Sequence, residues 1–309
     1  MRRQASVCIG LFLWFFSVTS AFAQPGRILH SEGPSRIAVV AATPAERLTL
    51  QRGTSVVWSA TGLRFAPWGH DAPLRLNEAG LTGLAFTGWS GGDGCCWVTH
   101  VFARAATGVV HAGTFNLGRV PLAERRLQQP GDTVIRVPDA VFDAWDGSLL
   151  GRSISPAVPL RWDGHRLIPD DTAMRLTPAQ ALGSHACGVS TLAGPAGRFA
   201  SPEAAVAALR AATWARRGVV GESVSARSEA ARLVACLVYG GQARAGRDLL
   251  RAAWPSNDRA GLLATERQLV ARLACSGFGD TLRAVNRSDA PFLGGRCARN
   301  GRDFSLLRD

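Results

Sequence analysis

Lysine is absent from this chain of 309 residues, so all 35 of its basic side chains are arginine. Also missing are the sequence signatures of several well-known sites: the Gly-x-Ser-x-Gly elbow of serine hydrolases, the Walker phosphate loop, the Rossmann glycine pattern and the His-Glu-x-x-His zinc pair. The six histidines show no metal-ligand spacing either. These absences weigh against the most familiar hydrolytic, nucleotide-dependent and zinc-dependent activities.

A run of about 20 apolar residues, which a membrane span needs, is also missing. The apolar stretch Cys8–Val18 is shorter; it follows Arg2 and Arg3 and precedes a small-residue cleavage site that ends at Ala23. This order is typical of a secretory signal peptide over Met1–Ala23, with an uncleaved anchor helix as the alternative. We therefore expect a periplasmic or secreted protein that does not span the membrane once it is processed.

Acidic residues are few beside the arginines, and the formal net charge is +12. Such a charge suits nucleic acid or another anionic partner, although codon bias in a soluble exported protein is the plainer explanation. Because the arginines are scattered and exported proteins rarely meet nucleic acid, we expect no nucleic-acid partner. Weak attraction to anionic envelope polymers or lipid is the better expectation. A hydrophobic content of 47% indicates a globular chain with a core.

No Cys-x-x-Cys pair occurs, which argues against a thioredoxin-type redox site or a zinc ribbon. Six cysteines follow the signal peptide, and an even number in an exported chain favours disulfide bonds. They are Cys95, Cys96, Cys187, Cys236, Cys275 and Cys297. Cys95 and Cys96 either bridge each other in a strained ring or reach two different partners. With the adjacent bridge, we expect the pairs Cys187–Cys236 and Cys275–Cys297.

Turn residues and apolar periodicity divide the rest of the chain into a β-rich domain (24–175), a loop-like linker (176–197), a helical domain (198–287) and a tail (288–309). The expected fold class is α+β, with the β-rich part a two-sheet sandwich or a partial propeller. The predicted strands are Arg36–Val40, Thr54–Ser59, Leu81–Phe86, Trp97–Phe102, Val109–Phe115, Thr133–Val137 and Ala157–Trp162. Asp163 and Gly164 predict a two-residue hairpin turn between Leu160–Trp162 and His165–Leu167.

In the second part, apolar residues recur with helical spacing. Ser201 and the proline after it predict a helix start, and Ala204–Arg216 continues that helix. Three further apolar stripes predict helices that end at Gly240, before Pro255 and near Ser276. The short joints between them predict antiparallel neighbours.

The most distinctive segment is Thr87–Phe102, where a glycine-rich turn leads into the paired cysteines and then into a strand. Strand alternation predicts one face made by Cys96, Val98, His100 and Phe102, and the other by Trp97, Thr99 and Val101. The binding candidates here are Asp93, Trp97 and His100. Each also has a structural interpretation: Asp93 caps the turn, Trp97 anchors the core, and His100 is a hydrogen-bonded core residue.

Tryptophans recur through the β-rich part, at positions 58, 68, 89, 97, 145 and 162. We expect core anchors, with a sugar-stacking surface as the alternative. Asp139, Asp143 and Asp146 crowd together, but their spacing does not match the alternating oxygen ligands of a calcium loop. We therefore expect no cofactor and no metal site, with calcium as an unsupported option.

Five residues match a Ser-Gly-Gly-x-x-Cys-Cys turn: Ser90, Gly91, Gly92, Cys95 and Cys96. On this turn the chain resembles a family of exported bacterial proteins of unknown function, whose β region is related to FG-GAP/VCBS-type repeats. A second likeness is the Tyr-x-Gly turn at Tyr239 and the Ala-Trp-Pro end at Trp254, which resemble the family's carboxy-terminal helical part. The resemblance implies a fold and no known activity, and the calcium loops of such repeats are lacking.

Two functions are consistent with the sequence. The first is a non-catalytic exported envelope protein, a binding or scaffolding module for an unknown envelope protein or polymer. The second is a disulfide-stabilised hydrolase of cell-wall or carbohydrate material, with a site near Asp93, His100 and the tryptophans. The missing signatures favour the first, and a concave pocket with convergent polar groups would favour the second.

Overall fold

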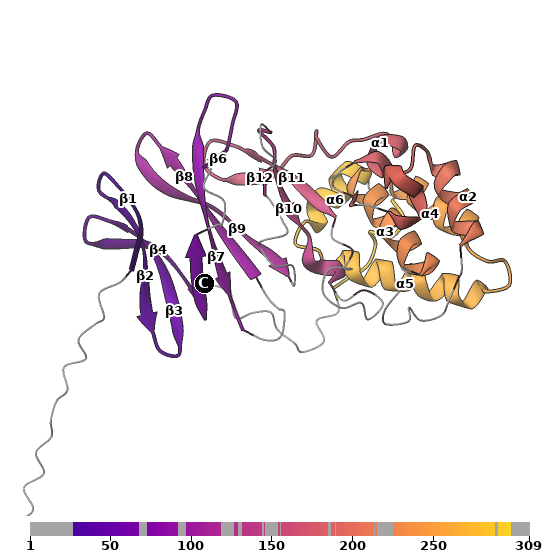
Figure 1. Cartoon of the computed structure of the whole chain (residues 1–309), viewed down its shortest axis with the longest axis horizontal. Coiled ribbons are helices and arrows are strands. Elements are labelled where there is room, and N and C mark those ends of the chain that lie inside the picture. The colour runs from indigo at the N-terminus through magenta and orange to yellow at the C-terminus, as the bar shows by residue number, and fades with distance from the viewer. Residues whose placement is uncertain are drawn as a thin grey trace, which may run out of the picture.

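The structure, a computed structural model, describes residues 27–67, 73–91, 97–118, 127–128, 132–143, 145, 154, 156–184, 187–188, 190–212, 214, 225–287 and 290–297. Antiparallel β sheets occupy residues 27–169, and a part made of six helices follows (Figure 1). The expected α+β class is therefore confirmed.

Sheet A is a four-stranded meander in the order β1-β2-β3-β4. Its strands are β1 (Arg27–Glu32), β2 (Ser35–Ala42), β3 (Ala45–Arg52) and β4 (Ser55–Gly62). Only two residues separate each strand from the next, and Gly33 and Gly53 adopt positive φ angles of 54° and 61° in two of these turns. Glycine accepts this backbone region without the steric cost that a Cβ atom brings.

Sheet B contains β5 (Arg64–Pro67), β7 (Thr82–Trp89), β8 (Trp97–Ala105) and β9 (Gly108–Gly118) in that order, with β6 (Leu74–Arg75) also paired to β7. Sheet C contains β10 (Ile135–Pro138), β11 (Ala157–Trp162) and β12 (Leu167–Pro169). All seven strands predicted from the sequence are present. The additional strands β1, β3, β5 and β6 are either short or rich in charged residues, and the predicted hairpin arm His165–Leu167 is shifted to Leu167–Pro169.

One predicted turn is wrong in length. Trp162 pairs with Leu167, so the β11–β12 hairpin has a loop of four residues rather than two. The Asp163 carboxylate accepts hydrogen bonds from the backbone N–H groups of His165 and Arg166, both at 2.8 Å. This side chain closes a wider turn than the Asp-Gly dipeptide alone predicts.

The sheets lie in layers (Figure 1). One face of sheet B packs against sheet A through a core of Ile37, Val39, Leu48, Leu50, Phe65, Phe86, Phe102 and Val109. The other face of sheet B contributes Ala85, Val101 and Ala103 to a larger core that also includes sheet C and the helices. Sheets A and B thus pack face to face as in a sandwich, and one continuous core joins the β-rich and helical parts.

The helices are α1 (Pro178–Gly183), α2 (Pro202–Ala211), α3 (Ala226–Tyr239), α4 (Ala243–Ala253), α5 (Arg259–Ala274) and α6 (Gly279–Asn286), with short 3-10 helices η2 (Ala140–Phe142) and η5 (Thr191–Ala196). Helix α3 is central, since 11 of its 14 residues are buried. The Ser201 cap and the helix ends at Gly240, Pro255 and Ser276 agree with the prediction within a residue or two.

The segment 176–197, expected to be a loop-like linker, instead contains α1 and η5. Thr177 and Gln180 form a capping box at the start of α1, which stabilises a helix too short to show an apolar stripe. Ala181 and Leu182 bury its inner side. Helix α2 ends at Ala211 rather than Arg216.

Candidate functional site

Two of the three binding candidates lie on one strand. Trp97 begins β8, and His100 follows three residues later. The third candidate, Asp93, lies outside the described residues, as do Cys95 and Cys96. The site can therefore be built only from the strand side of the cysteine turn.

His100 belongs to a hydrogen-bonded trio on the face of sheet B that meets sheet A. Its Nδ1 lies 2.9 Å from Oγ1 of Thr114, and the same hydroxyl lies 3.0 Å from Nε2 of His111. A β-bulge opposite Val101 and Phe102 leaves Ala112 unpaired in the ladder, so His111 shares a face with Thr114. A hydroxyl has one proton, so Thr114 donates to one imidazole and accepts from the other.

Both imidazoles resist protonation. Burial lowers the pKa of His100 to about 3, and the nearby His111 contributes in the same direction. Burial also lowers the pKa of His111 to about 4, although a hydrogen bond with the Gly113 backbone opposes this. Both rings are therefore neutral at neutral pH, and neither supplies a cation to a ligand.

Aromatic rings enclose the trio. Trp58 of β4 stacks on His111 with ring centres 4.4 Å apart and meets His100 edge-on at 5.0 Å. The Nε2 atom of His100 is buried and has no hydrogen-bond partner among the described residues. The His100 side chain lines a depression, together with Phe65 and Trp89, that is too narrow for a water molecule. The core interpretation of His100 is confirmed, because it is only 2% exposed and hydrogen-bonded.

Trp97 points to the other side of β8, as strand alternation predicts. It is half-buried and packs against the larger core, with its ring centre 6.3 Å from that of Trp89. Trp145 is 3% exposed, which is the core position expected for it. Trp97 and His100 therefore do not converge on one site.

A cluster that the sequence did not predict joins the two parts of the molecule. Asp139, between β10 and η2, is 5% exposed. Its Oδ2 accepts a hydrogen bond of 2.5 Å from the hydroxyl of Tyr239, at the end of α3, and a second from the hydroxyl of Ser276, just after α5. Its Oδ1 accepts from the backbone N–H of Val141 at 3.0 Å. Arg272 of α5 adds hydrogen bonds to the carbonyls of Val141 and Asp143.

Burial dominates the titration of this cluster. It raises the pKa of Asp139, while hydrogen bonds from Ser276, Tyr239 and Val141 oppose the shift. Burial and the adjacent carboxylate raise the pKa of Tyr239. The hydroxyl groups of Tyr239 and Ser276 both donate their protons in hydrogen bonds to a carboxylate that is buried in the core. This arrangement is a joint between β10 and the helices, and the sequence signals for it are the crowded aspartates and the single tyrosine of the chain.

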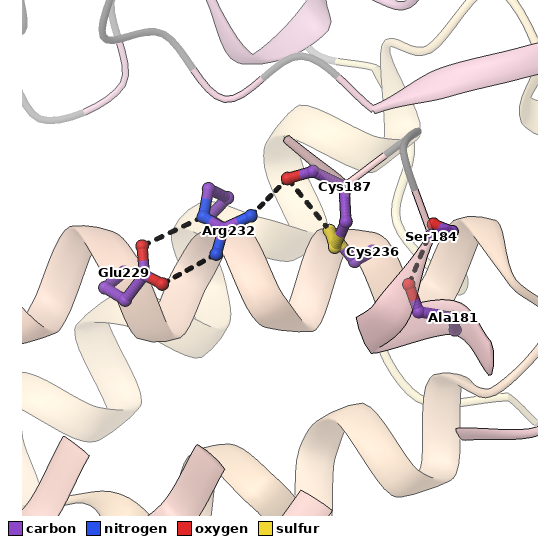
Figure 2. The surroundings of a disulfide bond; sticks show 6 residues. All are labelled: Ala181, Ser184, Cys187, Glu229, Arg232 and Cys236. Atoms are coloured by element: carbon purple, nitrogen blue, oxygen red, sulfur yellow. Dashed lines mark hydrogen bonds and ion pairs between the residues drawn. A yellow bond between two sulfur atoms is a disulfide. The ribbon is translucent and has the colours of Figure 1, made fainter. Parts of the chain in front are cut away.

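The two disulfide bonds predicted for the second half are present: Cys187–Cys236, with Cα atoms 5.3 Å apart, and Cys275–Cys297, at 4.7 Å. Figure 2 shows the first bridge beside an ion pair on α3. Glu229 is 2% exposed and holds Arg232 through two hydrogen bonds of 2.6 and 2.9 Å. Arg232 also donates to the carbonyl of Cys187, so the pair supports the disulfide loop.

Most of the exposed large aliphatic side chains of the described residues lie on the two edge strands of sheet A or next to them. Five large hydrophobic residues of the described chain are exposed: Ile28, Val56, Val57, Leu63 and Leu263. The first three lie on the edge strands β1 and β4, and Leu63 follows β4 directly. Exposed apolar groups that gather in one place mark interaction surfaces more often than scattered ones do.

Cross-strand register defines the outer face of sheet A, the face turned away from sheet B. It has three rows: Val40, Arg47 and Thr61; Ile28, Ala38, Thr49 and Ser59; Ser31, Arg36, Gln51 and Val56. The rows contain two arginines and no acidic residue. Their centre is made of the small side chains Ala38 and Thr49, both buried, with the exposed Ile28 and Val56 on the edge strands.

Within the described residues, no three His, Cys, Asp or Glu side chains come together as metal ligands. Both carboxylate oxygens of Asp139 accept hydrogen bonds from groups of the chain itself. Asp146 lies outside the described residues. None of the described helices is both long and apolar enough to cross a membrane. Comparisons with protein-family models, curated proteins and solved structures find no match to this chain.

Proposed function

We propose that this chain is a non-catalytic exported envelope protein that acts as a binding or scaffolding module, and that the outer face of sheet A is its binding surface. The observation that carries the proposal is that four of the five exposed large aliphatic residues in the described part of the chain lie on the edge strands of sheet A or directly after β4. A monomer with no partner for sheet A gains nothing from leaving these groups in water.

The buried polar groups support the same proposal. His100, Asp139 and Glu229 all lie inside the core, and their hydrogen bonds go to residues of the chain itself. Catalytic groups need access to a substrate and a position from which to transfer protons. These three side chains instead stabilise the fold: His100 between sheets A and B, Asp139 between β10 and the helices, and Glu229 through Arg232 on α3.

The hydrolase alternative requires a pocket beside His100. The described depression there is too narrow for water, and Trp97 faces the opposite side of the strand. No described observation favours this alternative, and Asp93 lies outside the described residues.

Export is part of the proposal. Disulfide bonds persist in oxidising compartments, and the two described bridges are consistent with an extracytoplasmic location. We propose a periplasmic or secreted protein on the combined basis of these bridges and the N-terminal signal pattern. Membership of the exported FG-GAP/VCBS-related family is likewise a proposal that rests on the Ser90–Cys96 turn.

Capture from an envelope extract tests the proposed function. The processed chain, immobilised, should retain an extract component that is lost with the double variant Ile28→Ser/Val56→Ser. The control is Leu263→Ser, which removes an aliphatic group that is 45% exposed from α5. Retention of no component, or equal loss with the control, would contradict sheet A as the binding surface.

A further inference from the structure

Deepening the proposed function, we infer that the partner of the outer face of sheet A is an anionic lipid surface. Its arginines would pair with phosphate headgroups, and its exposed aliphatic side chains would enter the interfacial region. This assignment rests on the charge of the face and on its apolar rim.

The cations of the outer face are free to meet an external anion. Arg36 and Arg47 are both exposed, and neither forms an ion pair with a described residue. Guanidinium groups bind phosphate through two parallel hydrogen bonds, which suits them to lipid headgroups.

The two acidic residues of sheet A do not cancel this charge. Glu32 accepts a 2.7 Å hydrogen bond from Arg104 of sheet B, and Glu46 accepts one of 2.6 Å from the backbone N–H of Phe65. Both carboxylates are thus engaged toward sheet B. The outer face therefore has a positive potential with no acidic residue of its own.

The apolar rim favours lipid over a purely polar polyanion. Its members Ile28 and Val56 are each 56% exposed. Stable peripheral attachment to a bilayer takes both electrostatic attraction to anionic lipid and some apolar burial at the interface. The outer face of sheet A offers the two together.

A second copy of the chain is a poorer partner than anionic lipid. Without Arg2 and Arg3 the formal net charge of +12 becomes +10, so two processed chains repel each other.

Vesicle sedimentation tests the inference with the processed chain, Gln24–Asp309. One set of vesicles contains phosphatidylcholine with about one third phosphatidylglycerol, and the other contains phosphatidylcholine alone. At about 0.1 M salt, charges more than about 10 Å apart are largely screened, so only a face close to the lipid contributes. We expect binding to the anionic vesicles and none to the neutral ones.

The variant Arg36→Glu/Arg47→Glu should weaken binding by at least about 25-fold, since each basic side chain near an anionic surface is worth about fivefold. The control Arg259→Glu/Arg267→Glu makes the same charge change on exposed residues of α5, at the other end of the molecule (Figure 1). It should stay within about twofold. Circular dichroism confirms that both variants are folded.

Three results would overturn the lipid assignment: no binding to anionic vesicles, equal weakening by both arginine pairs, or equal binding to neutral vesicles. Soluble poly-glutamate bound with the same dependence on Arg36 and Arg47 would replace it with an acidic protein partner. The chain could fail to bind anionic vesicles and still retain an extract component in a way that depends on Ile28 and Val56. In that case the proposed function is supported and only the lipid inference is contradicted.

Discussion

Tyr239 donates its hydroxyl hydrogen to Oδ2 of Asp139 across 2.5 Å, although the two residues are 100 positions apart in the chain. Asp139 follows the first strand of sheet C, and Tyr239 ends the central helix α3. Ser276 donates to the same carboxylate oxygen. One buried carboxylate therefore accepts hydrogen bonds from residues at the ends of two helices, α3 and α5. These bonds fix the position of sheet C relative to the helices.

Removing either hydroxyl should destabilise the fold. We expect Tyr239→Phe and Ser276→Ala each to lower the free energy of unfolding by about 1.5–3 kcal/mol, because each donates to a charged group. The double variant should cost less than the sum, since loss of one donor raises the pKa of Asp139 further and the neutral acid needs the second donor less. Urea titration measures all three; strictly additive costs would show that the hydroxyls act independently.

Acid should destabilise the protein through His100. Its pKa of about 3 lies below the 6.5 of a free imidazole, so below pH 6.5 the unfolded chain takes up a proton that the folded chain refuses. The free energy of unfolding should therefore decrease as the pH is lowered. At pH 5, His100 alone should account for a loss of about 2 kcal/mol. Asp139 works in the opposite sense, because its raised pKa favours the folded state as pH falls.

The variant His100→Leu isolates this contribution. Its stability should lose the His100 part of the pH dependence between pH 6.5 and 4, whatever the substitution does at neutral pH. The control His165→Gln changes a histidine in the exposed β11–β12 turn and should keep the dependence of the parent chain. Equal pH dependence in all three chains would show that His100 does not control it.

The two described disulfides should differ in their resistance to reduction. Cys187 and Cys236 are each 7% exposed, whereas Cys275 and Cys297 are exposed. Because a thiolate must reach the sulfur that it attacks, mild dithiothreitol on the native protein should open Cys275–Cys297 first. Alkylation followed by peptide mass spectrometry gives the order. Opening of the buried bridge first, or of both together, would contradict the difference in access.

Removing the positive charge of Arg232 on α3 should lower the stability of the fold. Arg232→Met leaves the buried Glu229 without its cation and should lower the free energy of unfolding by about 3–5 kcal/mol. The control is Arg251→Met, which breaks the 2.8 Å pair with Glu266. Arg251 is half-exposed, so this change should cost less than about 1 kcal/mol. Thermal or urea unfolding measures both, and similar costs would mean that burial of Glu229 does not matter.

Much of the fold was predictable because its signals are local. Alternating apolar residues located seven strands, and Ser201, Gly240 and Pro255 marked helix boundaries that the structure reproduces. The missed elements lack such signals: β1 and β3 mix charged and apolar residues, α1 is stabilised by the Thr177 capping box, and α6 is only eight residues long.

The site was less predictable because its contacts are distant in sequence. His100 was placed on the correct face by alternation, but its partner Thr114 lies on another strand. The approach of His111 to Thr114 depends on a bulge that one strand alone does not show. Asp139 stood out only as one of three crowded aspartates, and nothing local pairs it with Tyr239. The outer face of sheet A needs the register of four strands, so the sequence alone does not separate it from the inner face.

Tyr239 is the single tyrosine of the chain, and its place at the Asp139 joint makes it a natural spectroscopic reporter. Biosynthetic replacement with a fluorinated tyrosine would give one ¹⁹F resonance, with no engineered probe and no assignment problem. Any partner or condition that weakens the contact between the strands and the helices at Asp139 would change the chemical shift or width of that one resonance.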